Sequence, residues 1–119
     1  MIATIRVAIK NPFEILLALE ALVAISRVQI RYKNVPPLYR AGVRYQREAP
    51  GREDWQSALE TYLRGYGDCE DLAAYRVAEL RERGELKARP MVRRSYVGYH
   101  VLVRRANGKS EDPSRRLGM

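Results

Sequence analysis

The sequence contains one cysteine and one histidine among its 119 residues. A single cysteine excludes an internal disulfide, and one cysteine with one histidine cannot supply the ligands of a zinc finger. A lone thiol without a pairing partner is typical of a reducing compartment. Any chemistry that needs a thiol or an imidazole must therefore use Cys69 and His100.

Long hydrophobic runs are also missing. The most apolar segment, residues 13–25, contains Glu20 and is shorter than the roughly 20 apolar residues that cross a bilayer. No cleavage site of the small-x-small kind follows it, as a signal peptide would require. We therefore interpret it as the first core helix of a soluble, cytoplasmic protein that does not use a membrane.

The length fits a single domain over residues 1–119, because two separate cores would leave each half marginally stable. Hydrophobic residues make up 46% and charged residues 30%, which is typical of a globular protein. The net charge of +8 favours acidic partners without naming one. Paired arginines occur along the chain, but no nucleic-acid-binding motif accompanies them, so nucleic acid is not the expected partner.

The predicted elements divide the domain into residues 1–53 and 54–119. In the first part, alternation over residues 5–9 indicates a short strand, and Asn11-Pro12 begins a helix that continues to Lys33. Residues 28–32 also have the propensity of a strand, so the end of this helix stays open. Residues 36–53 are rich in proline and glycine and indicate a surface loop with little regular structure.

In the second part, Asp54 is expected to cap a helix over residues 55–64, with Gly65 at its end. A further helix begins at residue 68 or 69 and continues to about residue 83, followed by strands over residues 88–94 and 99–104 and a return near residues 110–112. Helices followed by antiparallel strands predict an α+β fold, with N-terminal helices packed on a small antiparallel sheet.

The only thiol stands at the first turn of a predicted helix, in Gly67-Asp68-Cys69-Glu70-Asp71. Free N–H groups and the helix dipole favour a thiolate there and can bind an oxyanion. Three neighbouring carboxylates oppose this, and the dipole contributes only about 0.3–1 kcal/mol against about 1.4 kcal/mol for one pKa unit. A nucleophilic thiolate would therefore need a neighbouring imidazolium.

His100 is the only candidate for that imidazole, and Asp112 could orient it from the returning strand. A loop centred on Ala106 would place His100 opposite Asp112, with Gly108 at a positive φ. A tight turn at Asn107-Gly108 would instead place Asp112 opposite Val103, on the wrong face. We predict the longer loop, because it allows the three side chains to meet.

Three blocks resemble the transglutaminase-like superfamily: residues 67–73 (GDCEDLA), residues 99–103 (YHVLV), and Gly108 with residues 112–114 (DPS). The resemblance covers roughly residues 54–114 and implies a papain-like α+β core. It also implies that Cys69 is the nucleophile, His100 the general base and acid, and Asp112 the orienting carboxylate. The compact ending over residues 112–119 and the Pro-Pro-Leu-Tyr segment resemble short stand-alone members from bacteriophages and prophages, which would act in the bacterial host cell or with the virion.

The resemblance further implies an acyl transfer in which the thiolate attacks a glutamine carboxamide of a protein or peptide. The resulting thioester is resolved by a lysine amine, giving a cross-link, or by water, giving deamidation, and no metal or organic cofactor is needed. A second oxyanion donor is expected upstream of the cysteine, where Trp55, Gln56 and Tyr66 are candidates. Tyr99 and Trp55 are candidates for lining a substrate groove.

Several other interpretations stay open. The same triad would serve a cysteine peptidase or amidase, and the basic charge would suit a non-catalytic virion or nucleic-acid-binding module. Each residue also has a structural alternative: Cys69 as a buried hydrophobe, Asp68 and Asp71 as a capping box, His100 as an ordinary strand residue, and Asp112 as a strand end. A zinc site built on Cys69 and His100 lacks ligand pairs at a suitable spacing.

Overall fold

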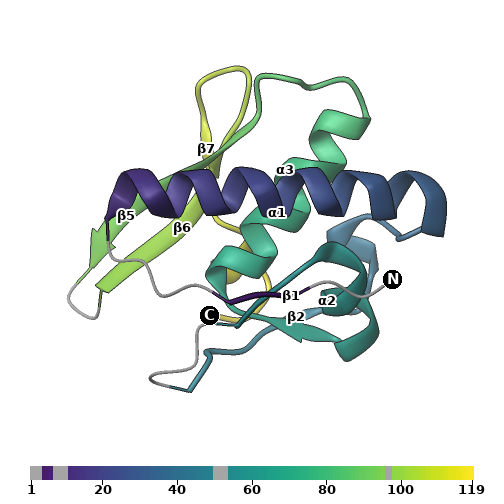
Figure 1. Ribbon diagram of the computed structural model, residues 1–119, viewed down its shortest axis with the longest axis horizontal. Coiled ribbons are helices and arrows are strands. Elements are labelled where there is room, and N and C mark those ends of the chain that lie inside the picture. Colours follow the sequence, from purple (N-terminus) through teal and green to yellow (C-terminus); the bar gives the residue numbers. More distant parts are fainter. Residues whose placement is uncertain (1–3, 7–10, 50–53, 96–97) are drawn as a thin grey trace.

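The computed structural model describes residues 4–6, 11–49, 54–95 and 98–119. Helix α1 (Pro12–Lys33) crosses in front of α3 (Cys69–Glu82), and both pack against the sheet formed by β5 (Arg89–Ser95), β6 (Gly98–Arg104) and β7 (Ser110–Glu111) (Figure 1). This arrangement confirms the predicted α+β class. Across the part of the chain that the structure describes, no helix combines the length and apolar character needed to span a bilayer.

Helix α1 follows its local sequence signals. The Asn11 side chain accepts a hydrogen bond from the Phe13 N–H at 2.8 Å, Pro12 occupies the first turn, and Asn34 ends the helix in the left-handed conformation. The buried face consists of Ile15, Leu19, Leu22, Val23, Ser26 and Gln29. The helix includes residues 28–32, because packing of this face against α3 outweighs their strand propensity.

Helix α3 is the central element of the core. The predicted capping box is confirmed: the Asp68 Oδ1 atom accepts from the Cys69 N–H at 2.7 Å, and the Asp71 Oδ2 atom accepts from the Asp68 N–H at 3.0 Å. Every residue from Cys69 to Leu80 is buried. The candidate nucleophile Cys69 is therefore the first residue of α3, and two reciprocal hydrogen bonds between Asp68 and the first turn hold the start of this helix.

The predicted helix over residues 55–64 begins later than expected. Asp54–Gln56 instead form strand β3, which pairs antiparallel with β1 (Thr4–Arg6), and α2 (Ala58–Arg64) starts after Ser57. The cap expected at Asp54 is therefore wrong. The fully buried side chain of Trp55 and the pairing with a distant segment decide this local structure. The remainder of the predicted strand over residues 5–9 lies outside the described residues.

The segment predicted as an irregular loop also contains regular structure. It forms a 3-10 helix, η1 (Leu38–Arg40), and strand β2 (Arg44–Tyr45), which pairs parallel with β4 (Tyr66–Gly67). Leu38 is fully buried in a second apolar cluster with Leu72 and Tyr75, which explains why the segment is ordered against the core. Residues 50–53 of this predicted loop lie outside the described residues.

The β6–β7 hairpin has a register that neither predicted turn gives. Val103 faces Glu111 and Arg104 faces Ser110, so the ladder ends before Asp112. The Arg105 N–H donates to the Lys109 carbonyl at 2.8 Å, and Gly108 has the predicted positive φ of 85°. The expected pairing of His100 with Asp112 across the ladder is therefore wrong, because the chain leaves the sheet and enters α4 (Pro113–Arg116).

Candidate active site

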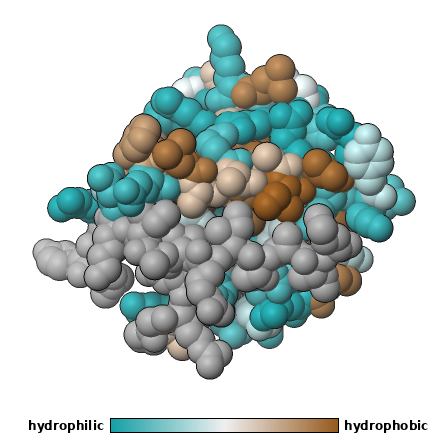
Figure 2. Space-filling view, viewed as in Figure 1, coloured by the Kyte–Doolittle hydropathy of each residue, from teal (hydrophilic) through white to brown (hydrophobic). Residues whose placement is uncertain are grey.

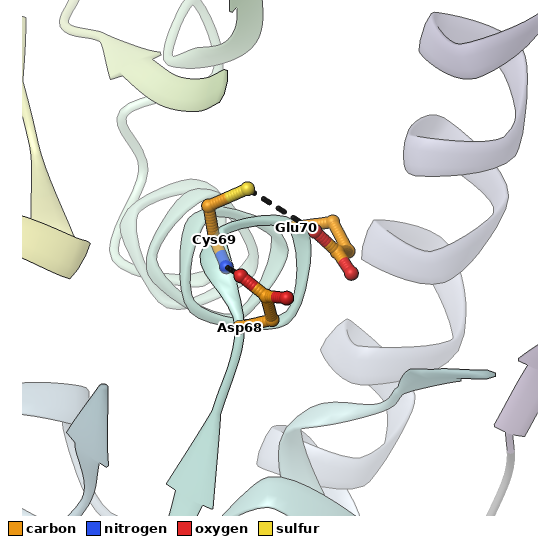
Figure 3. Close-up of side chains that lie close together, drawn as sticks. All are labelled: Asp68, Cys69 and Glu70. Atoms are coloured by element: carbon orange, nitrogen blue, oxygen red, sulfur yellow. Dashed lines mark hydrogen bonds between the residues drawn. The ribbon is translucent and has the colours of Figure 1, made fainter. Parts of the chain in front are cut away.

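Cys69 lies buried at the start of α3, with 7% of its surface exposed. Its thiol donates a hydrogen bond to Glu70 Oε2 at 3.1 Å (Figure 3). The backbone N–H of Val101 in β6 also interacts with the sulfur and favours its thiolate form. The thiol is therefore placed where the first turn of α3 meets β6, the strand that carries His100.

Electrostatics around the sulfur favour the neutral thiol. Burial raises the pKa of the Cys69 thiol far above its ordinary value, and the charges of Glu70 and Asp68 raise it further. Burial also raises the pKa of Glu70 to about 8, with a further contribution from the charge of Asp68. The start of α3 therefore does not by itself produce a thiolate. This agrees with the expectation from the sequence that the neighbouring carboxylates outweigh the helix dipole.

Asp71 is the second buried carboxyl group at this helix start. Burial raises its pKa well above the ordinary value, followed by the charge of Glu70. Its Oδ1 atom accepts from the Gln56 N–H at 2.7 Å, while Oδ2 serves the cap of α3. This carboxyl group therefore links β3 to the helix that carries the thiol, which is a structural role.

His100 and Asp112 form the second part of the candidate site. The Nε2 atom of His100 lies 2.9 Å from Asp112 Oδ2, and the two side chains are 17% and 26% exposed. The other oxygen, Oδ1, accepts from the Arg115 N–H at 3.3 Å and caps α4. The predicted contact between His100 and Asp112 is present. Asp112 makes it from the N-cap position of α4 and not from a position paired with His100 in the sheet.

This contact also selects the tautomer of the imidazole. A carboxylate accepts the proton of Nε2, so the neutral ring then carries its lone pair on Nδ1. The Nδ1 atom of His100 is thus the nitrogen that can take a proton from a nucleophile. Among the described residues, no hydrogen bond joins Cys69 Sγ to His100; the thiol is directed to Glu70 instead. The structure therefore brings His100 to Asp112 and places Cys69 against the residue next to His100.

Two of the four accessory residues predicted from the sequence belong to the apolar cluster that contains Cys69. Trp55 is fully buried there, and its Nε1 donor has no hydrogen-bond partner among the described residues. Tyr99 is partly buried and packs against the same cluster, which also contains Val101. An unpaired buried donor is unusual, because it loses its hydrogen bonds to water.

The other two accessory residues lie on a different side of the α3 start. The side-chain amide of Gln56 donates to the Tyr66 carbonyl at 2.9 Å and to Thr61 at 3.4 Å, so its donors are occupied. The Tyr66 hydroxyl accepts from Arg64 at 3.5 Å. Both residues line a cavity of about 670 Å³, together with Asp68 and Asp71, and neither Cys69 nor His100 lines it.

Among the described residues that line the cavity, acidic side chains outnumber basic ones, although the whole chain has a net charge of +8. Its lining consists of Gln46, Arg47, Glu48, Ala49, Asp54, Gln56, Glu60, Arg64, Tyr66, Gly67, Asp68 and Asp71. These residues come from separate segments, which the pairing of β2 with β4 and the hydrogen bonds from Glu48 to Asp68 and from Gln56 to Asp71 bring together. No local sequence pattern therefore indicates the cavity.

Among the described residues, one group of side chains at the start of α3 has the spacing of candidate metal ligands. Asp68, Cys69 and Glu70 bring ligand atoms within 4.8 Å of one another. Each of them is already engaged: Asp68 Oδ2 accepts from the Glu48 N–H at 2.9 Å, and Glu70 accepts from the thiol. The group is therefore explained by hydrogen bonding within the protein and carries no metal assignment.

Comparison with known proteins adds no relative: no protein family, curated protein or solved structure matches the chain significantly. The described residues thus define an α+β domain with a buried thiol and a histidine–aspartate pair. The resemblance to the transglutaminase-like superfamily and its papain-like core stays a prediction.

Proposed function

We propose that this protein is a cysteine acyltransferase of the transglutaminase-like type. The observation that supports it most directly is the hydrogen bond between His100 Nε2 and Asp112 Oδ2, on the strand whose next residue, Val101, contacts the Cys69 sulfur. His100 and Asp112, which lie twelve residues apart in the sequence, are thus in contact, and the sulfur lies against the backbone of the residue that follows His100. In this proposal Cys69 is the nucleophile, His100 the proton carrier and Asp112 the group that orients the imidazole.

The neutral state of the thiol determines how the reaction begins. Because burial and Glu70 disfavour a resting thiolate, the Cys69 proton moves to His100 Nδ1 as the sulfur attacks the carboxamide carbon. The imidazolium then protonates the departing nitrogen, ammonia leaves, and a thioester remains. A lysine amine or water then attacks the thioester carbonyl and gives a proton to His100. The C–S bond breaks, the leaving thiolate takes this proton from His100, and the product is an isopeptide or a carboxylic acid.

Trp55 supplies a candidate for stabilising the oxyanion. Its Nε1–H is buried, unpaired among the described residues, and part of the apolar cluster that contains Cys69. An oxyanion forming beside the sulfur would give this donor an acceptor that the resting protein lacks. Loss of one such donor typically lowers kcat by about 10²–10³.

A cysteine peptidase or amidase would use the same three residues, and the acceptor would then be water. A non-catalytic module is favoured by one observation, the hydrogen bond that directs the buried thiol to Glu70 rather than to His100. The three hypotheses differ in the products that they predict, so one assay separates them.

The test uses a glutamine-containing protein and a fluorescent primary amine. We expect incorporation of the amine with release of ammonia, its abolition in Cys69→Ala, and a loss of about 10²–10⁴ in rate in His100→Ala. Asp112→Asn should also reduce the rate. Lys109→Ala, on the exposed hairpin loop, is the matched control and should be fully active.

The outcomes that oppose the proposal are specific. New N-termini without ammonia release would indicate a peptidase. Folded protein that shows neither product, together with a Cys69→Ala variant that is indistinguishable in every assay, would contradict catalysis by the thiol. Thermal unfolding of each variant shows whether the fold is retained.

A further inference from the structure

The outer face of α1 is apolar and exposed. Phe13, Leu17, Val28 and Tyr32 are 67%, 57%, 56% and 71% exposed, and Ala21 and Ala24 between them are also exposed. Figure 2 shows the corresponding band of hydrophobic surface along α1, on the side of the helix that faces the viewer. We call these six residues the α1 stripe.

The stripe is continuous, because its members lie four, four, three, four and four positions apart. At 100° per residue they occupy a sector of about 100° on the helix surface, opposite the face that packs on the core. Scattered exposed apolar residues are ordinary, but a continuous row of them on one helix marks an interaction surface.

The stripe is also symmetric about its own centre, between Leu22 and Val23. Counted outward from that point, Ala21 corresponds to Ala24, Leu17 to Val28, and Phe13 to Tyr32. Two copies of α1 placed antiparallel about a twofold axis would therefore bring each residue against its counterpart in the other copy. The small alanines at the centre let the two helix backbones approach closely, and the large side chains at both ends enclose them.

The charges beside the stripe follow the same symmetry. Glu14 in the first turn of α1 corresponds to Arg31 in the last turn, so the antiparallel arrangement places opposite charges together at both ends. Arg31 contacts Glu82 through Nε and Nη2, and its side chain stays 56% exposed, which leaves it able to reach a second carboxylate.

We propose that two copies of this chain associate through an antiparallel pairing of their α1 stripes. A membrane surface would also cover apolar side chains, but it would explain neither the palindromic spacing of the stripe nor the opposite charges at its two ends. The area of one face of a helix about 33 Å long is smaller than a standard interface of roughly 800 Å² per partner, so we expect a weak dimer that dissociates on dilution.

Analytical ultracentrifugation from low micromolar to near millimolar concentration tests the association. We expect a monomer–dimer equilibrium whose dissociation constant rises at least about tenfold in Ala24→Glu, because a buried charge at the centre separates the helices. Leu63→Glu is the matched control: it introduces the same charge at an apolar residue of α2 that is 60% exposed and outside the stripe. This variant should associate as the wild type does.

Disulfide trapping tests the orientation. In an antiparallel pair, residue 17 lies beside residue 28 of the other copy, whereas the two copies of residue 17 are about 16 Å apart along the helix axis. A mixture of Leu17→Cys and Val28→Cys proteins should form the mixed dimer much faster than either protein forms a dimer alone. Cys69 is buried and does not compete.

Three results would overturn the proposal. The first is a monomer at every concentration, and the second is an Ala24→Glu variant that associates as tightly as the wild type. The third is a monomer that sediments with vesicles of anionic phospholipid and loses this binding in Ala24→Glu, which would assign the stripe to a membrane surface. None of these readouts depends on the proposed acyl transfer, so the two proposals fail independently.

Discussion

The interaction between Cys69 and Glu70 makes a quantitative prediction about the reactivity of the thiol. Glu70 Oε2 lies 3.1 Å from the sulfur, and its pKa is raised to about 8 by burial. Glu70 is therefore mostly neutral near pH 6 and mostly charged near pH 9. The charge that opposes thiolate formation thus appears in the pH range in which a thiol would normally ionise.

The size of the effect follows from the distance. At an effective dielectric constant of about 20, two unit charges 3.1 Å apart interact by about 5 kcal/mol, and one pKa unit corresponds to about 1.4 kcal/mol. Even a small part of this energy exceeds one pKa unit. We therefore expect Glu70→Gln to raise the alkylation rate of Cys69 by at least about tenfold near pH 9 and to change it little near pH 6.

The assay is the pH dependence of alkylation by iodoacetamide, followed by mass spectrometry on the folded protein. Glu82→Gln is the matched control, since it makes the same change at the opposite end of α3, where Glu82 is paired with Arg27 and Arg31. Parallel pH profiles for the wild type and Glu70→Gln would refute the reasoning, because they would show that Glu70 does not control the ionisation of the sulfur.

Three further predictions concern the start of α3, each measured by urea unfolding. Asp68→Ala removes the N-cap and should lower the free energy of unfolding by about 1–2 kcal/mol; an unchanged midpoint would contradict the cap. Gly67→Ala places a Cβ atom 3.0 Å from the Cβ atom of Asp71, so a loss of about 1–3 kcal/mol is expected. The control is Ala24→Ser at an exposed position of α1, which should change stability less. Burial raises the pKa of Glu70 from 4.5 to about 8, so its stabilising protonated form is lost between about pH 5 and pH 8; stability should fall over that range, and the fall should be smaller in Glu70→Gln.

Elements with strong local signals could be predicted from the sequence. Asn11-Pro12 begins α1, and the reciprocal cap of Asp68 and Asp71 begins α3, in both cases because the side chains that satisfy the helix end are neighbours in sequence. Strand β3 could not be found in this way. Its pairing with β1 and the burial of Trp55 depend on contacts that no local window contains.

The candidate site was predicted in part. His100 and Asp112 are in contact, but the predicted register is wrong, because the returning strand ends at Glu111 and does not reach residue 112. Pro113 directly after Asp112 was the available signal, since proline favours the first turn of a helix and the preceding aspartate can cap it. The burial of Cys69, which the sequence leaves as one of two alternatives, results from packing of α3 against α1 and β6, and no local pattern decides between them.

Two hydrogen bonds join the start of α3 to other segments: Asp68 accepts from the Glu48 N–H after β2, and Asp71 accepts from the Gln56 N–H in β3. Cys69 is 7% exposed, so at a fixed pH the rate of its alkylation also depends on how often this corner of the molecule opens. With a single cysteine in the chain, no second sulfur contributes to the signal. Alkylation of Cys69 at constant pH thus reports local opening at the start of α3 without the introduction of a second cysteine.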